Sequence, residues 1–240
     1  MLTRRKLPMR TLQLSTQDVT LAIRIWGEDN ILAPTLVMVH GFPDNSLVWQ
    51  TVAEQLSSMF RVVAYDVRGA GESSIPKATS AYKISQLVAD LAAVIEKVSP
   101  TEPVHLIGHD WGAIQCWEAV TTPLLAGRTA SFTSISGPSL DHAAYWMRQG
   151  LSHGSLDDKR KILNQLLHSW YIAAFHFPLA SQLTWRVAFN KWPQAFSPIQ
   201  SLNLEDFPTQ ASDGHHGVKL YRANFIERLF KPKQRHTNVP

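Results

Sequence analysis

The chain has 240 residues, of which 45% are hydrophobic, and this suits one domain, or a core with a lid, around a sizeable apolar interior. The net charge is +4, but the basic residues gather near the two ends without a nucleic-acid-binding motif, so we expect no nucleic-acid partner. No apolar run approaches the roughly 18 residues of a membrane span, and the basic N-terminal stretch lacks the apolar segment of a secretory signal. The single cysteine, Cys116, excludes an internal disulfide, and we expect a cytoplasmic protein.

Strands alternate with helices over the first 138 residues. Short apolar runs separated by turn residues predict strands over 11–14, 19–26, 35–39, 61–66, 104–107 and 129–136. Helices are expected over 48–60 and 84–98, the second because apolar residues recur there at helical spacing. This alternation predicts the α/β fold class, with a mostly parallel sheet that helices cover on both faces. In such sheets the functional site lies beyond the carboxyl ends of the strands.

The character of the chain changes after residue 138. From 139 to 230 the alternation is lost, aromatic residues become frequent, and helices are expected over 162–177 and 218–230. A helical lid over the sheet is the simplest interpretation. The predicted division is a core over 1–138, a lid over 139–235 and the start of the next core strand over 236–240. Because further strands would be needed to close the sheet, we expect its last strands to be missing.

The sequence Gly-His-Asp-Trp-Gly, 108–112, follows an apolar strand and precedes a helix-compatible segment. This is the layout of a nucleophile elbow, with Asp110 where serine usually stands and with Gly108 and Gly112 leaving room for the turn. A carboxylate, with an ordinary pKa of about 3.9, is ionised at neutral pH and can attack a saturated carbon to give an ester. Water can cleave that ester, whereas serine would give an ether. Asp110 therefore predicts alkyl transfer from an epoxide or an alkyl halide.

Cleavage of the ester needs an oxyanion hole. One donor is expected to be the backbone N–H of Trp111, the residue after the nucleophile, and the other the N–H of Phe42 in the loop after the third strand. That loop also contains His40, Gly41 and Pro43, to which we assign structural roles. The Phe42–Pro43 bond is a candidate for the cis form in so tight a turn.

The segments “HGFPD”, “DVRGAGES” and “GHDWG” resemble the α/β-hydrolase superfamily, specifically its epoxide hydrolase and haloalkane dehalogenase branch. The resemblance covers residues 11–230 and implies an α/β-hydrolase fold with a lid. Epoxide hydrolases of this branch use two lid tyrosines, one in a Y-x-x-x-F-x-x-P context and one before arginine. Tyr171, with Phe175 and Pro178, matches the first, and Tyr221 before Arg222 matches the second. Phenols can donate the proton that an opening epoxide oxygen needs, so both tyrosines are candidate general acids.

A closer resemblance is to the hydrolase half of bacterial two-part proteins in which a short-chain dehydrogenase follows the hydrolase. It rests on “SAYKISQLVADLAAVIEKVSPTEPVHLIGHDWG” and “SFTSISGPSLDH”, and it implies a fused dehydrogenase domain downstream in a full-length protein. The present residues contain no dinucleotide loop, because “GAGESS” lacks the third glycine and leads into a proline-containing loop. We expect neither a cofactor nor a metal in this chain.

The mechanism also needs a histidine to activate water and an acid to orient it, which in this superfamily follow the lid. The histidines belong to other motifs, a strand or the lid, or come too early, as His236 does. Asp141 is the one carboxylate near an alternative position for the acid. We expect the catalytic acid and histidine to be absent and the chain to be truncated by roughly 50 residues. It would then form the ester without hydrolysing it.

The predicted function is an epoxide hydrolase domain that converts a small apolar epoxide and water to a vicinal diol, with a role in detoxification. Two alternatives stay open: a dehalogenase that uses the same aspartate with Trp111 holding the halide, and a non-catalytic domain of the same fold. Dehalogenases of this branch tend to carry asparagine where Phe42 stands, which favours the epoxide hydrolase. An ester-cleaving enzyme fits least, because Asp110 cannot replace serine in acyl transfer.

Overall fold

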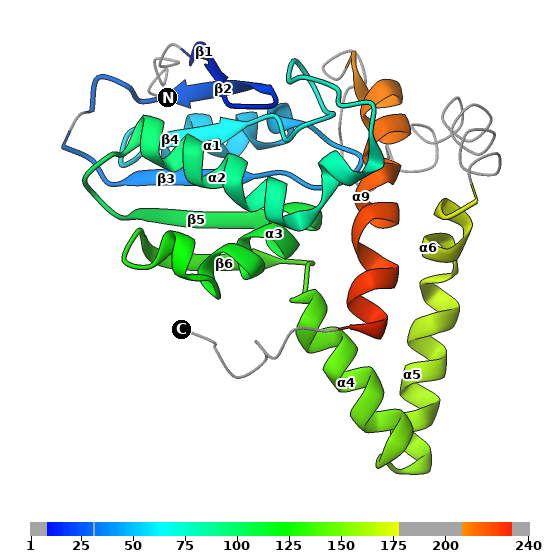
Figure 1. Cartoon of the computed structure of the whole chain (residues 1–240). Coiled ribbons are helices and arrows are strands. Elements are labelled where there is room, and N and C mark those ends of the chain that lie inside the picture. Colours follow the sequence, from blue (N-terminus) through cyan, green and yellow to red (C-terminus); the bar gives the residue numbers. More distant parts are fainter. Residues whose placement is uncertain (1–8, 31, 178–207, 232–240) are drawn as a thin grey trace, which may run out of the picture.

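The computed structural model describes residues 9–30, 32–177 and 208–231 (Figure 1). Their strands form one six-stranded sheet in the order β1-β2-β4-β3-β5-β6. The strands are β1 Met9–Ser15, β2 Thr20–Trp26, β3 Thr35–Val39, β4 Arg61–Tyr65, β5 Val104–His109 and β6 Thr129–Ile135. β1 and β4 pair antiparallel with β2, whereas β4, β3, β5 and β6 run parallel. The predicted mostly parallel α/β sheet is confirmed, with every strand within two residues of its predicted bounds.

The helices agree less closely with the sequence. The helix predicted over 84–98 is confirmed as α2 Ile84–Val98, but the one predicted over 48–60 is a 3-10 turn followed by a short helix. The helix predicted over 162–177 is two helices, and its first one begins earlier because Ser155 and Asp158 form a capping box. The helix predicted from 218 begins at Gln210, where glycines and polar residues hid it. The remaining elements are η1 Ser46–Trp49, α1 Gln50–Leu56, η2 Thr79–Tyr82, α3 Trp111–Val120, η3 Pro123–Leu125, α4 Leu140–Ser152, α5 Leu156–His168, α6 Trp170–Phe175 and α9 Gln210–Phe230.

Helices cover both faces of the sheet. The side chains of β3 alternate between two apolar clusters, with Val37 and Val39 in one and Leu36 and Met38 in the other. The first cluster is completed by α2 and α3, and the second by η1 and α1, for example through Trp49. A strand that is covered on both sides reads as a continuous apolar run, which is why β3 showed no polar alternation in the sequence.

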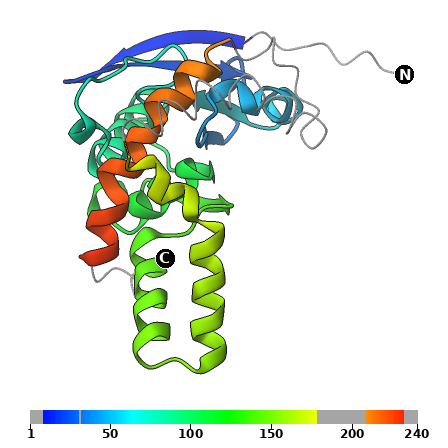
Figure 2. The same cartoon turned by 90° about the vertical axis from the view of Figure 1, so that its right-hand side faces the viewer.

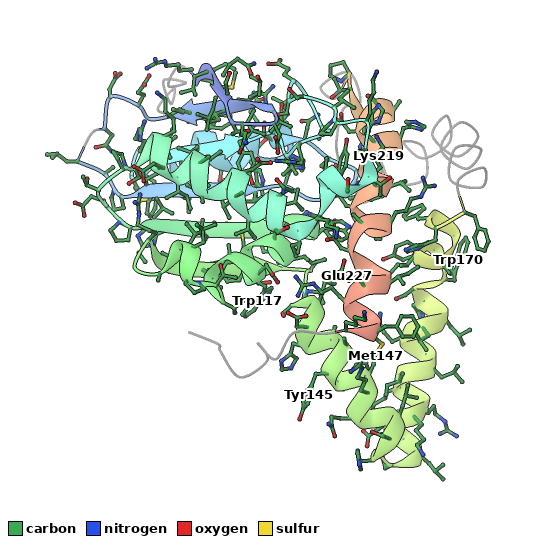
Figure 3. The ribbon with its side chains drawn as sticks, in the orientation of Figure 1. Trp117, Tyr145, Met147, Trp170, Lys219 and Glu227 are labelled. Carbon is green, nitrogen blue, oxygen red and sulfur yellow. The ribbon has the colours of Figure 1, made fainter. Side chains whose placement is uncertain are left out.

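Helices α4, α5, α6 and α9 lie beyond the carboxyl ends of the parallel strands, with α9 between the sheet and α6 (Figure 1). Helices α4 and α5 form an antiparallel pair that projects away from the sheet (Figure 2). On α6, Trp170 points away from the fold and is 69% exposed (Figure 3). Among the described residues, we find no helix with the length and apolar character to cross a membrane. The division into core and lid stays a prediction, and its last part, 236–240, lies outside the described residues.

A buried carboxylate, Asp66, ties the loops that follow β3 and β4 to each other and to Arg24 in β2. Asp66 accepts hydrogen bonds from Arg24 Nη1 (2.9 Å) and from the backbone N–H of Ser46 (2.9 Å). It also accepts one from the N–H of Glu72 (2.9 Å). Burial alone would raise the pKa of Asp66, but Arg24, His40 and these hydrogen bonds outweigh burial and lower it. Asp66 therefore acts as an ionised structural centre for this edge of the sheet.

We expect Asp66→Asn to lower the free energy of unfolding by about 3–5 kcal/mol, because the buried Arg24 guanidinium loses its charge partner. Urea denaturation followed by circular dichroism measures this loss. Because the folded pKa of Asp66 lies below its unfolded value of about 3.9, the wild type should also lose this contribution as the pH falls below that value, and the variant should not. Asp157→Asn, which breaks an exposed ion pair with Lys161, is the matched control and should change nothing measurable. Equal losses in both variants would contradict the assignment.

Candidate active site

Asp110 lies at the sharp turn between β5 and α3. Its backbone has φ 51° and ψ −118°, a combination that non-glycine residues rarely adopt. Its N–H donates to the carbonyl of Ile135 at the end of β6 (2.9 Å), and its carbonyl accepts from the N–H of Ile114 in α3 (3.0 Å). The turn is thus held by a strand on one side and by a helix on the other.

Three glycines leave the space that this turn needs. A Cβ on Gly112 would lie 2.1 Å from a backbone oxygen of β3, and one on Gly108 would lie 2.6 Å from the backbone of α3. The sequence pattern indicated these two. It missed Gly137, where a Cβ would lie 2.3 Å from the carbonyl oxygen of Asp110. The available signal was the Gly-Pro pair that follows the strand before it.

Two backbone N–H groups bind the carboxylate of Asp110. The N–H of Phe42 donates to Oδ1 at 2.8 Å, and the N–H of Trp111 also donates to this carboxylate. The Phe42–Pro43 peptide bond is cis, as the sequence predicted. Gly41 lets the loop approach, because a Cβ there would lie 2.5 Å from the Cβ of Asp110. The two predicted amide donors are therefore together at one carboxylate.

Backbone amide groups stabilise the charge of Asp110 in part, in a largely buried site. Burial raises the pKa of its carboxyl group, while the N–H groups of Phe42 and Trp111 and the nearby His109 oppose that rise. The net direction is upward, because these groups compensate only part of the lost hydration. The result is a desolvated anion with two fixed donors, an arrangement that also suits an oxyanion formed at the same place.

His40 supports the loop that carries Phe42. Its Nε2 accepts from the N–H of Val67 (2.9 Å), so its Nδ1 carries the proton and donates to the carbonyl of Gly41 (2.9 Å). Burial lowers the pKa of this imidazole, which is consistent with a neutral ring. These two contacts hold the His40–Gly41 end of the loop against the residue that follows Asp66.

Tyr171 on α6 and Tyr221 on α9 meet near Asp110, although 50 residues separate them in the chain. Their ring centroids are 6.2 Å apart. The ring of Tyr221 packs edge-on against Trp111 (5.1 Å) and Phe42 (5.3 Å), so it contacts both residues whose amides bind Asp110. Tyr221 is 5% exposed and Tyr171 40% exposed. The fold thus brings all five candidate residues, which come from four segments, into one place.

Both phenols are held in their protonated form. Burial raises the pKa of Tyr171 and of Tyr221, and the negative charge of Asp110 raises both further. A hydrogen bond from the side chain of Trp111 opposes the rise at Tyr221. The only polar group of that side chain is a donor, so the phenol oxygen accepts and its own proton is left for another acceptor.

Two further carboxylates lie close to this site, and the sequence interpretation missed both. Burial, Asp110 and Asp213 together raise the pKa of Asp44 to about 6. Asp213, on α9, accepts hydrogen bonds from Asn45 Nδ2 (3.0 Å) and from the N–H of Gly71 (2.9 Å). Asp44 had a signal, since it ends the segment “HGFPD”. Asp213 had none, because it belongs to the part of α9 that the apolar pattern did not reveal.

The predicted absence of the catalytic acid and histidine stays a prediction. Within 9–30, 32–177 and 208–231 no histidine is hydrogen-bonded to Asp110, and His236 lies outside these ranges. Both carboxylate oxygens of Asp141 accept from Arg228 Nη1 at 2.9 Å, so Asp141 faces a guanidinium. The same ranges hold no cluster of side chains suited to a metal ion. Pro178, part of the motif around Tyr171, is also outside the described residues.

The amino-acid sequence is similar to known hydrolases over most of its length. The family model described as “alpha/beta hydrolase fold” matches residues 34–228. A Mycobacterium tuberculosis protein named “Probable oxidoreductase EphD” is 38% identical over 222 residues, which are 91% of this chain and 37% of that protein. “Epoxide hydrolase A” of the same organism is 38% identical over 132 residues, 54% of this chain and 39% of its own. The chain therefore spans well under half the length of these relatives.

Solved epoxide hydrolases share the fold. The crystal structure of an epoxide hydrolase from Vigna radiata has a TM-score of 0.71 and 23% identity, covering 93% of this chain and 73% of that one. The inhibitor complex of the Bacillus megaterium epoxide hydrolase also has a TM-score of 0.71 and 23% identity, covering 95% and 77%. At this level of identity the likeness shows the fold alone.

We expect Gly41→Ala to disturb the site, because its added methyl group would lie 2.5 Å from the Cβ of Asp110. Overpacking of this kind costs about 1–3 kcal/mol. It should also move the Phe42 N–H away from the carboxylate, and losing this donor should raise the pKa of Asp110 further. Urea denaturation gives the stability, and ¹³C NMR of labelled aspartate carboxyl groups gives the pKa.

Gly127→Ala is the matched control for this experiment. Gly127 has φ +74°, but a Cβ there would meet nothing within 4 Å. Its substitution should cost only the left-handed strain of about 1–2 kcal/mol and leave the pKa of Asp110 unchanged. If Gly41→Ala also left that pKa unchanged, the described contact between the loop and Asp110 would be wrong.

Proposed function

The chain belongs to the α/β-hydrolase fold family, and we propose that within this family it is an epoxide hydrolase domain that uses Asp110 as its nucleophile. One observation carries the proposal. The Asp110 carboxylate lies at a strained elbow, bound by the N–H groups of Phe42 and Trp111, with the phenols of Tyr171 and Tyr221 beside it. A nucleophilic anion with proton donors close to it suits the opening of a strained C–O bond.

In the first step Asp110 attacks one epoxide carbon. One carboxylate oxygen forms a new C–O bond, the bond from that carbon to the epoxide oxygen breaks, and its electron pair goes to the epoxide oxygen. The elbow holds the carboxylate out from the sheet, and burial removes the water that would compete for it. The product is an alkyl ester of Asp110.

The phenols make the epoxide oxygen a better leaving group. The alkoxide that forms would be strongly basic, and a hydrogen bond or proton from Tyr171 or Tyr221 stabilises it as the ring opens. Burial and Asp110 keep the pKa of both phenols above the ordinary value, so the proton is present at neutral pH. The hydrogen bond that Tyr221 accepts from Trp111 favours aiming its proton towards the substrate.

In the second step water attacks the carboxyl carbon of Asp110 and releases a vicinal diol. The N–H groups of Phe42 and Trp111, which bind the free carboxylate, are placed for the oxyanion of this step. Activation of the water needs a base. The described residues account for ester formation, whereas no described histidine is bonded to Asp110, so they do not account for that base.

The surroundings favour an apolar substrate. The ring of Tyr221 is enclosed by those of Phe42, Trp111 and Phe175, which form edge-on contacts with it. Phe175 also contacts the ring of Tyr171 edge-on. Such a wall binds hydrocarbon and offers few polar partners. The substrate that we propose is therefore a small apolar epoxide. A fused dehydrogenase domain stays a prediction, supported by the word “oxidoreductase” in the name of the mycobacterial relative.

Dehalogenation is less well supported by the same contacts. A halide ligand would need a free donor beside the nucleophile, but Phe42 has an apolar ring and the side chain of Trp111 bonds to Tyr221. The phenols also have no part in a reaction whose leaving group is already a stable anion. We therefore put forward no second function.

Incubation with styrene oxide should attach one substrate molecule to Asp110, because the described residues support ester formation. Intact-mass measurement detects the adduct, and fragmentation of the peptide locates it. Asp110→Asn, which keeps the shape of the side chain without its nucleophilic charge, should form none. Tyr171→Phe and Tyr221→Phe should each slow the reaction by about tenfold or more. If the wild type formed no adduct, or formed it equally with Asp110→Asn, the proposed function would be wrong.

The rate of ester formation should depend on pH at both ends. It should fall as the pH drops through the raised pKa of Asp110, because the protonated carboxyl is no nucleophile. It should fall again only above the ordinary tyrosine value of about 10, because both phenols have raised pKa values. Single-turnover rates at several pH values measure the profile. An alkaline limb well below that value would contradict the roles of the phenols.

A further inference from the structure

A buried cluster of three charged side chains lies at the far end of α9. Arg228 donates through Nη1 to both carboxylate oxygens of Asp141 (2.9 Å each) and through Nη2 to Glu118 Oε1 (2.8 Å). The cluster is almost fully enclosed, since the three residues are 7%, 3% and 9% exposed. It joins three helices, because Arg228 is on α9, Asp141 on α4 and Glu118 on α3. No part of the proposed reaction uses it.

The cluster repeats a contact that α3 and α9 already make at the site. Trp111, at the start of α3, packs against Tyr221 on α9 with a centroid distance of 5.1 Å. Glu118 and Arg228 lie seven residues further along these two helices. Seven residues are about two turns, or about 10 Å along a helix. The helices are therefore joined at two points, one at the reacting groups and one two turns away. In Figure 3, Trp117 and Glu227 mark the positions next to Glu118 and Arg228.

Other polar contacts attach α9 to different parts of the core. Asp213 binds Asn45 and Gly71 in the loops, and Asn224 accepts from the N–H of Ile84 at the start of α2 (2.8 Å). These contacts hold α9 against the sheet. The contact between Arg228 and Glu118 instead ties it to the helix whose first turn is the nucleophile elbow.

Buried hydrogen bonds between charged side chains are suited to holding α9 at a fixed distance from α3. Charge-assisted hydrogen bonds are short and directional, and in a water-poor environment they resist exchange with solvent. Both carboxylate oxygens of Asp141 accept from Nη1 of the guanidinium, which leaves Nη2 directed at Glu118. Displacing α9 relative to α3 would separate these charges without water to replace them.

We propose that Arg228, held by Asp141 and Glu118, is a positioning residue that sets the phenol of Tyr221 over the carboxylate of Asp110. The proposal rests on the proposed function for the role of Tyr221, but the geometric tie can be measured without any reaction. A rigid second contact two turns away limits tilting of α9, and a small tilt at Arg228 becomes a displacement at Tyr221.

The first experiment reads the position of Tyr221 directly. 3-Fluorotyrosine placed at position 221 alone gives one ¹⁹F resonance, which is sensitive to the neighbouring rings of Trp111 and Phe42. We compare the wild type with Glu118→Leu, which removes the tie to α3 but leaves the pair of Arg228 and Asp141 neutral. Asp90→Asn is the control, because it removes the buried partner of Arg68 at another place in the fold. The resonance should shift in Glu118→Leu and not in the control.

The second experiment measures ester formation with styrene oxide in single turnovers. Glu118→Leu should lower the maximal rate by about 10- to 100-fold with little change in half-saturating concentration, as a displaced catalytic group does. Glu118→Gln, which keeps an acceptor, should recover most of the rate, and Asp90→Asn should keep all of it. In a Tyr221→Phe background Glu118→Leu should cost little more, because the group it positions is already gone.

The results of these experiments distinguish a failure of the proposed function from a failure of the positioning role of Arg228. If the wild type forms no ester, the proposed function fails, and the ¹⁹F resonance alone judges the tie between the helices. An unchanged resonance in Glu118→Leu overturns the inference, whatever the epoxide does. If ester formation works but Glu118→Leu slows it as much in the Tyr221→Phe background as in the wild type, the cluster supports only the fold and the inference is wrong.

Discussion

The backbone turn at Asp110 is the constraint on which the rest of the site depends. A non-glycine residue with φ 51° and ψ −118° is held against its own preference, and such strain persists only where the surroundings over-determine it. Here β6 and α3 bind its backbone, and Gly41, Gly112 and Gly137 let other segments approach within distances that a side chain would block. The turn places one carboxylate at the carboxyl ends of the parallel strands.

The pKa values of two buried aspartates in this region are shifted in opposite directions. Asp66 binds the guanidinium of Arg24, and its pKa is lowered in spite of burial. Asp110 is bound by backbone amides, and burial raises its pKa. The positive charge of Arg24 stabilises the Asp66 carboxylate, so that Asp66 is a structural anion and a poor nucleophile. Amides stabilise the second only in part, so its lone pairs stay available and its negative charge can be transferred into a new bond.

Helix α9 contacts three different parts of the core. Through Asp213 it binds the loops that follow β3 and β4, through Tyr221 it reaches the nucleophile, and through Arg228 it binds α3 and α4. Most of its core-facing positions carry polar or aromatic residues instead of aliphatic ones. This is why it packs closely and yet shows only a weak apolar pattern in the sequence.

The sequence by itself determined the sheet, the elbow and the identity of the nucleophile candidate, because these follow from short-range rules. Apolar runs predicted the strands, and the spacing of Gly108 and Gly112 around Asp110 predicted the turn. The resemblance to epoxide hydrolases added Tyr171 and Tyr221. Only the tertiary structure decided that Gly137, Asp44 and Asp213 border the site and that Arg228 ties α9 to α3. These are contacts between segments far apart in the chain. A local pattern of spacing or polarity cannot predict which buried charged side chains come into contact when the helices pack.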